Sequence, residues 1–174
     1  MWQSMVQDAL RQFGLQLVRC DGRSLTRADR RELTRLRGVP RFRPGEVALL
    51  GRRWRFIDSA SFLSAFHAIF VQEIYRFEAR SDSPVILDCG ANIGLSVLYL
   101  KELHPSARIT AFEPDPVAFQ TLEHNVACRG YTNIRLEPKA VWTASTDLLF
   151  APDGADGGGC ALRNLKVGNR QRLV

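Results

Sequence analysis

The sequence has few cysteines, almost no lysine and no long apolar run, and each absence excludes a class of protein. No apolar stretch among its 174 residues approaches the ~20 residues of a membrane-spanning helix. Residues 1–18 contain repeated glutamine and charged residues, so they lack the basic start and unbroken apolar core of a secretion signal. We therefore expect a cytoplasmic protein that has no membrane partner.

The four cysteines do not form a recognisable framework. None belongs to a CxxC pair, and no group of cysteines and histidines has the spacing of a zinc site. A chain of this size can bury a core without disulfides, and the expected compartment is reducing. The sequence thus predicts free thiols and no metal at all four positions, Cys20, Cys89, Cys128 and Cys160.

Positive charge is concentrated in the first half of the chain and is supplied by arginine. Residues 1–80 hold 15 arginines and 8 acidic residues, a net charge of +7, whereas residues 81–174 hold 9 basic and 10 acidic residues, a net charge of −1. The net positive charge of residues 1–80 could bind an anionic partner. Because aromatic residues do not alternate with the basic ones, we expect no nucleic-acid platform and a solvated basic surface instead.

The first half predicts helices around one hairpin. Residues 1–45 have rough helical spacing of apolar residues and look peripheral. Residues 46–57 predict two strands that turn at Gly51. Asp58 or Ser59 can cap a following helix over about 60–76, whose apolar stripe is typical of core packing.

From Pro84 onward, strands and helices alternate. A short apolar strand over 85–87 predicts a buried parallel strand. A helix over 95–103, a strand over 108–112, a helix capped by Asp115 and a strand over 133–141 follow, which is half of a doubly wound α/β sheet. A last hairpin is predicted from residues 148–150 and the returning segments 161–167 and 171–174. We expect an amino-terminal extension over 1–80 and a ligand-binding domain over 81–174.

The segment 88–94 (DCGANIG) carries the chemistry. It follows the first predicted parallel strand and opens a helix. Gly90 permits a sharp turn close to a ligand, and Gly94 permits close packing of the helix on the sheet. Asp88 is placed where open α/β sheets bind ligands, and the helix start leaves amide groups free.

Glu113 follows the next strand, 25 residues after Asp88. A carboxylate at this position can accept both hydrogen bonds of a ribose diol, which indicates a nucleoside cofactor. A dinucleotide fingerprint needs glycine where this chain has Asn92, and no Walker A loop is present. Because Asp88 would favour a cationic sulfonium or amino group over a phosphate, the pattern favours S-adenosylmethionine over NAD.

The run 85–126 resembles the core of FkbM-type methyltransferases, a branch of the class I S-adenosylmethionine-dependent enzymes. The matching motifs are DCGANIG, FEP over 112–114, Leu122 with Asn125, and Ala140-Val141. The resemblance implies a Rossmann-like sheet and cofactor-binding roles for Asp88, Gly90, Ala91, Asn92, Gly94, Glu113, Pro114, Asp115 and Ala140. It also implies methylation of a hydroxyl on a sugar or secondary metabolite.

The same resemblance implies an incomplete sheet. In the family, a further strand ends in an acidic motif beside the methyl group, and the chain stops at Val174 before such a segment. Two alternatives stay open: a non-catalytic fragment that keeps part of the cofactor site, and an NAD-binding module. No catalytic base is identified, although His67 is a candidate. An unpaired sheet edge could promote self-association.

Overall fold

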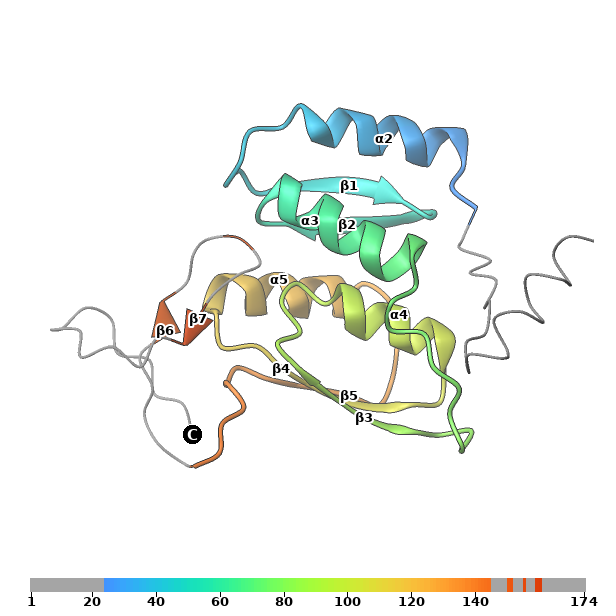
Figure 1. Cartoon of the computed structure of the whole chain (residues 1–174), viewed down its shortest axis with the longest axis vertical. Helices are drawn as coiled ribbons and strands as arrows, with labels where there is room; N and C mark the ends of the chain where they lie inside the picture. Colours follow the sequence, from blue (N-terminus) through green and yellow to red (C-terminus); the bar gives the residue numbers. More distant parts are fainter. Residues whose placement is uncertain (1–23, 145–149, 152–154, 156–158, 161–174) are drawn as a thin grey trace, which may run out of the picture.

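The base of the molecule is a parallel sheet of three strands, β3 (Val85–Cys89), β4 (Arg108–Phe112) and β5 (Ile134–Glu137), hydrogen-bonded in that order. Helices α4 (Leu95–Leu103) and α5 (Pro116–Ala127) connect the strands, and both lie on the same face of the sheet (Figure 1). The predicted alternation of strand and helix is therefore confirmed. The computed structural model describes residues 24–144, 150–151, 155 and 159–160.

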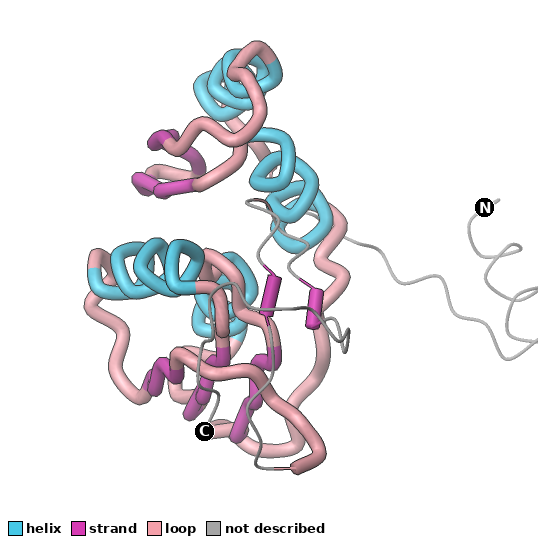
Figure 2. The backbone as a smooth tube through the Cα atoms, turned by 90° about the vertical axis from the view of Figure 1, so that its left-hand side faces the viewer, coloured by secondary structure: helices cyan, strands magenta, loops and turns pink. Residues whose placement is uncertain are grey.

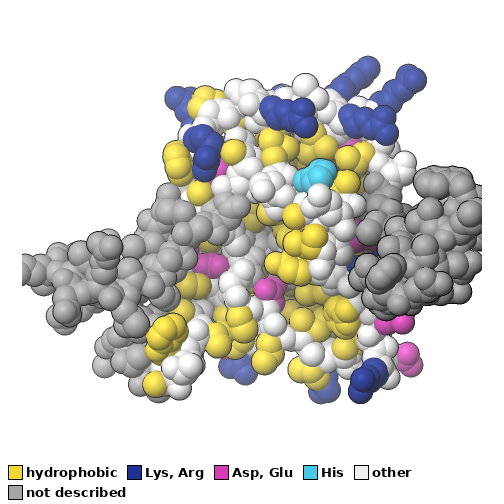
Figure 3. Space-filling view, viewed as in Figure 1, with side chains coloured by type: hydrophobic (Ala, Val, Ile, Leu, Met, Phe, Trp, Pro, Cys, Tyr) yellow, Lys and Arg dark blue, Asp and Glu magenta, His cyan; other side chains and the backbone are white. Residues whose placement is uncertain are grey.

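A second layer, built from the first half of the chain, lies on the other side of the two helices (Figures 1 and 2). It contains helix α2 (Arg27–Arg37), the antiparallel hairpin of β1 (Gly45–Leu49) and β2 (Arg52–Phe56), helix α3 (Ser59–Phe66) and the π-helical turn η1 (His67–Val71). The predicted hairpin is confirmed. Arginine side chains gather over α2 at the upper edge of the molecule (Figure 3).

The helix that begins after Asp58 is shorter than the sequence predicts. Asp58 caps α3 by accepting the amide of Ser61 at 2.9 Å, in line with the expectation of a cap there. The apolar stripe predicts a helix that extends to residue 76, but the chain widens into η1 and leaves helical geometry after Val71. Glu73 then adopts a positive φ of 53°, which a continuing right-handed helix does not allow.

One continuous core joins the two layers. Trp54 of β2 makes an edge contact with Phe70, with ring centroids 5.3 Å apart, and Phe70 makes another with Tyr99 of α4 at 5.5 Å. Trp54 is fully buried, and its indole N–H donates to the carbonyl of Leu49. Aromatic residues predicted to be core are thus the physical link between the hairpin and the helices above the sheet.

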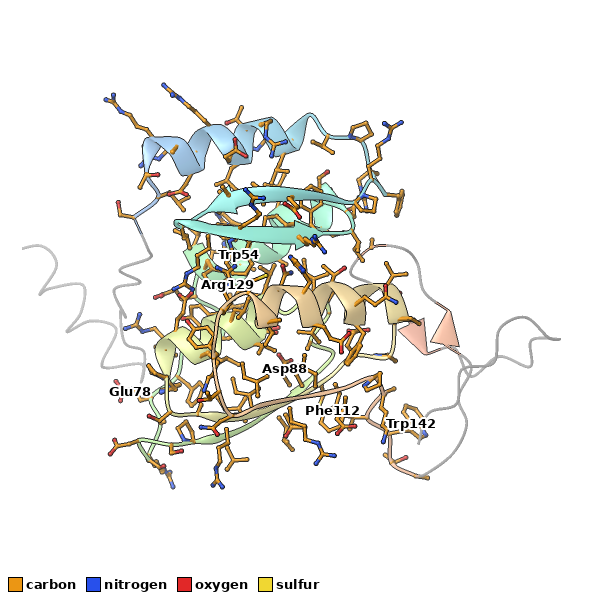
Figure 4. All side chains as sticks on the ribbon, turned by 180° about the vertical axis from the view of Figure 1, so that it is seen from behind. Trp54, Glu78, Asp88, Phe112, Arg129 and Trp142 are labelled. Atoms are coloured by element: carbon orange, nitrogen blue, oxygen red, sulfur yellow. The ribbon has the colours of Figure 1, made fainter. Side chains whose placement is uncertain are left out.

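The expectation that the first parallel strand is buried on both faces is wrong for the described residues. Val85 and Leu87 are 65% and 66% exposed, whereas Ile86 and Asp88, which alternate with them along the strand, face the helices. The reason is that both crossover helices cover one face, and no described helix lies against the other (Figures 1 and 2). Phe112 projects from this open face, opposite to Asp88 (Figure 4).

The last described elements are β6 (Phe150–Ala151) and β7 (Gly159–Cys160), which pair antiparallel in a small sheet separate from the main one. The predicted strand over 133–141 is shorter than expected and ends at Glu137. Of the segment 1–45 that is predicted to be helical, residues 1–23 lie outside the described residues, as do the strands expected over 161–167 and 171–174. In the described ranges, no helix is both long and apolar enough to cross a bilayer.

Candidate functional site

A strained turn separates β3 from α4. Gly90, Asn92 and Gly94 adopt positive φ angles of 105°, 47° and 88°. Apart from Gly90 and its two chain neighbours, no heavy atom of the described residues lies within 4 Å of the position that a Cβ on Gly90 would occupy, so this side of the turn is open. Such backbone conformations are costly for a residue with a side chain, and they persist where surrounding contacts enforce them.

The amides of this turn are consumed within the protein. Gly90 and Ala91 both donate to the carbonyl of Phe112 at 2.9 Å, which joins the turn to the end of β4. Ile93 donates to the side-chain oxygen of Asn92, and Gly94 donates to the carbonyl of Ala91. The free amides that the sequence predicts therefore belong to the first turn of α4, residues 95–97, which has no side-chain cap.

The role that the sequence predicts for Gly94 differs from what the structure shows. A Cβ on Gly94 would lie 2.6 Å from Cδ1 of Leu122, so the close approach is to α5 and not to the sheet. Gly94 also occupies the N-cap position of α4. The glycine in the sequence predicts a close approach at this position, but it does not show which element of the fold approaches.

Asp88 lies on the helix side of the sheet, between β3 and α4 (Figure 4). Its Oδ2 accepts a 2.5 Å hydrogen bond from the hydroxyl of Ser96 in the first turn of α4. Burial raises the pKa of Asp88 above its ordinary value, and the hydrogen bond from Ser96 opposes part of that rise. The carboxylate is therefore held in place by one hydrogen bond, and no positive charge among the causes of its pKa shift compensates its burial.

Glu113, just after β4, is only 6% exposed and connects two segments. Its Oε2 accepts the amide of Asn92 and its Oε1 accepts the amide of Asp115, both at 2.8 Å. Burial raises the pKa of Glu113, the two amides oppose the rise, and the negative charges of Asp115 and Asp88 add to it. In the part of the chain that the structure describes, none of these three carboxylates forms an ion pair.

The remaining predicted residues lie around this edge of the sheet. Asp115 is the N-cap of α5 and accepts the amides of Val117 and Ala118, and Pro114 connects it to Glu113. Ala140 lies three residues beyond the end of β5 and does not line the cleft described next. The structure thus brings Asp88, Glu113 and Asp115 together, and none of these three carboxylates lines the cleft either.

A cleft of about 180 Å³ opens between the glycine turn and α3. Its volume is below the ~300–1,000 Å³ of typical small-molecule pockets, so it would hold one end of a cofactor. The turn contributes one wall, and the opposite wall includes Asp58, Ser61 and Tyr75, which the sequence did not predict as site residues. No short-range signal could have found this wall, because it lies 15 or more residues before the turn. The residues lining the cleft are Ile57, Asp58, Ser61, Phe62, Ala65, Ile69, Tyr75, Gly90, Ala91, Asn92, Ile93, Leu95, Ser96 and Ala155.

Comparison with known proteins finds methyltransferases. The chain is 44% identical over 62 residues to methyltransferase sdnD of Sordaria araneosa, covering 36% of this chain and 24% of that protein. It is 37% identical over 62 residues to the 31-O-demethyl-FK506 methyltransferase FkbM of Streptomyces tacrolimicus, covering 34% of this chain and 24% of that protein. Both alignments thus span about a quarter of the relative. No protein-family model matches the chain.

Among solved structures, methyltransferase FkbM from Methylobacillus flagellatus is 26% identical with a TM-score of 0.34, covering 51% of this chain and 24% of that one.

Proposed function

Because the chain is homologous to FkbM-related, class I S-adenosylmethionine-dependent methyltransferases, we propose that the edge of the sheet around Asp88 and Glu113 binds S-adenosylmethionine. The observation that carries the proposal is the set of three carboxylates, Asp88, Glu113 and Asp115, gathered beside an open glycine turn with no ion pair among the described residues. An excess of buried negative charge favours a cationic ligand over a phosphate.

The cleft fits the amino-acid end of this cofactor. Free amides at the start of α4 attract a carboxylate, because the first turn of a helix carries partial positive charge. Ser96 lines the cleft, and its hydroxyl donates to Asp88, which lies behind it and does not line the cleft itself. The oxygens of these two side chains would supply acceptors for an ammonium group or a nearby sulfonium. The absence of a side chain at Gly90 leaves room for the ligand to approach the backbone.

Glu113 would hold the ribose. A carboxylate has about four lone-pair positions, and two of those on Glu113 accept the amides of Asn92 and Asp115. The other two remain for the ribose hydroxyls, and the same two amides fix the carboxylate in position before any ligand arrives. Pro114 and Asp115 would then border the adenine, with Ala140 on its other side, as the FkbM resemblance implies.

The reaction would be transfer of the methyl group to a hydroxyl of a sugar or secondary metabolite. When bound, the cofactor supplies an electrophilic methyl group on a good leaving group, so the protein chiefly aligns the acceptor. The name of the Streptomyces relative, which specifies an oxygen methyl acceptor, supports an O-methyltransferase. No general base is assigned: His67 is exposed on η1 and does not line the cleft, and Asp58 already accepts three donors.

Calorimetric titration of the protein with S-adenosylmethionine, S-adenosylhomocysteine and NAD tests the proposal. We expect saturable binding of the first two and none of NAD. Glu113→Gln should weaken S-adenosylhomocysteine binding about tenfold or more. The substitution replaces one carboxylate oxygen, which accepts a backbone amide, by an N–H₂ group, so two donors would face each other. Glu123→Gln, on the exposed face of α5, is the matched control and should bind as the parent does.

Other outcomes identify the two alternatives. Preferential binding of NAD would replace the proposal with an NAD-binding module. No saturable binding of any of the three ligands at millimolar concentration would support a fragment without cofactor binding. Binding without turnover of any alcohol would support a non-catalytic fragment that keeps a cofactor half-site.

A further inference from the structure

Asn125 joins three parts of the molecule through one side chain. It lies on α5, is 1% exposed, and is in contact with residues 70 and 32 positions earlier in the chain. Its Oδ1 accepts the amide of Arg55 at 2.8 Å, and its Nδ2 donates to the carbonyls of Arg55 at 3.0 Å and Ile93 at 2.9 Å. The first two bonds pair Asn125 with the outer edge of β2, and the third reaches the glycine turn.

We propose that Asn125 is a positioning residue that fixes the glycine turn for cofactor binding by tying it to the hairpin; this inference rests on the proposed function. The contact pattern needs one acceptor and two donors on a short side chain. Asparagine supplies all three, whereas aspartate of the same size has no donor for either carbonyl.

Ile93 is the residue through which this contact acts. It lines the cleft and stands between Asn92 and Gly94, whose φ angles are 47° and 88°. A left-handed φ at a residue with a side chain, as at Asn92, needs contacts that hold it. Asn125 holds the carbonyl of Ile93, while Glu113 holds the amide of Asn92 from the other side.

Helix α5 meets the turn at a second point one turn away. Leu122 packs against Gly94, three residues before Asn125 on the same face of the helix. The apolar contact fixes how close the turn lies to α5, and the hydrogen bond fixes its orientation. Loss of Asn125 would leave the apolar contact intact and release the orientation of Ile93 and of the amides that follow it.

The selective test is Asn125→Asp with two ligands, S-adenosylhomocysteine and adenosine. The Ile93 carbonyl that Asn125 holds lies next to the amides at the start of α4, which are proposed to bind the amino-acid end, whereas Glu113 keeps the hydrogen bond from the Asp115 amide. We therefore expect the affinity for S-adenosylhomocysteine to fall about tenfold or more, since two buried carbonyls lose their donor. The affinity for adenosine should change by less than about threefold. Hydrogen exchange of amides 92–97 should accelerate relative to the amides of β1. Glu123→Gln is the control on the same helix.

Equal losses for both ligands, or exchange that rises everywhere alike, would show a merely structural residue and overturn the inference. Unchanged affinity for S-adenosylhomocysteine in a folded variant would overturn it too. If the parent protein binds neither ligand, the proposed function fails, and hydrogen exchange still judges the positioning role. If Asn125→Asp does not fold, Asn125→Gln, which keeps the amide but is one carbon longer, should show the same selectivity to a smaller degree.

Discussion

Single residues at the edge of the sheet have both a structural and a proposed ligand-binding role. Glu113 connects the glycine turn to the start of α5 by accepting the amides of Asn92 and Asp115. Its remaining lone pairs are proposed to bind the ribose. Gly94 combines a left-handed φ of 88° with a close approach to Leu122. At Gly94 the left-handed φ and the close contact with Leu122 each favour glycine for a different physical reason, so suitable substitutions can separate the two effects.

Gly94→Ala should destabilise the protein more than Gly130→Ala. Both glycines have positive φ, 88° and 64°, so both variants incur a left-handed penalty of roughly 1–2 kcal/mol. Only Gly94 would place a Cβ 2.6 Å from buried Leu122, whereas nothing lies within 4 Å at Gly130. The clash should add about 1–3 kcal/mol, measured by urea unfolding. Equal losses would show that Leu122 moves aside freely.

At the scale of the elements, α3 depends on one buried carboxylate. Asp58 caps the helix and also accepts Nε of Arg41 at 2.9 Å and the amide of Phe42 at 2.7 Å. Phe42 adopts a positive φ of 58°, so these contacts also hold a strained position in the loop before β1. Burial raises the pKa of Asp58, but the hydrogen bonds from Arg41, Phe42 and Ser61 outweigh it, and the net pKa lies well below its ordinary value.

Asp58→Ala should lower the free energy of unfolding at pH 7 by roughly 2–4 kcal/mol, because a cap is lost and buried donors are left unpaired. The pKa of Asp58 is lower in the folded than in the unfolded state, so its contribution is complete above the ordinary value of 3.8 and is lost as the pH falls through the folded value. The difference in the free energy of unfolding between the parent and Asp58→Ala, measured by chemical unfolding, should therefore shrink as the pH falls below 3.8.

Asp58→Asn is the matched control for charge. Its amide oxygen can still accept the amide of Ser61, but it lacks the charge that faces Arg41. Its stability should fall between those of the parent and Asp58→Ala at pH 7. A loss that does not depend on pH in either variant would contradict the proposed contribution of the carboxylate charge.

At the scale of the whole molecule, the described residues fold around one core, whose members run from Leu36 to Val126. The aromatic residues of β2, α3 and η1 pack on one another, and Phe70 of η1 contacts Tyr99 of α4. Arg129 after α5 lies 4.3 Å above the ring of Trp54 (Figure 4). These contacts connect the hairpin layer to the helices on the sheet through one buried cluster. We therefore expect the described part of the chain to unfold as one cooperative unit.

Substitution of Trp2 and Trp142 by phenylalanine leaves Trp54 as the sole tryptophan and makes its fluorescence a probe of the hairpin layer. In urea, this fluorescence should change at the same midpoint as far-ultraviolet circular dichroism. Phe70→Ala, which removes a buried ring between Trp54 and Tyr99, should shift both midpoints together by a loss of about 3–5 kcal/mol. An earlier fluorescence transition would show an independently unfolding hairpin layer.

Local signals predicted most of the elements. The strand over 108–112 and the helix over 95–103 have the predicted bounds. The helix is delimited in the sequence by Gly94 before it and His104-Pro105 after it. The strand expected to reach residue 141 ends at Glu137. The last residue pair between β4 and β5 is Phe112 with Glu137, because β4 ends there. The residues after Glu137 therefore have no strand to pair with, although the sequence pattern continues.

The sequence by itself determined the alternation of strand and helix and the placement of Asp88 and Glu113 at neighbouring strand ends, since both follow from short-range spacing. Only the tertiary structure decided that α5 packs on Gly94, that α3 forms the second wall of the cleft, and that Asn125 connects the hairpin to the turn. These contacts join residues tens of positions apart, and the pattern at either end does not specify its partner.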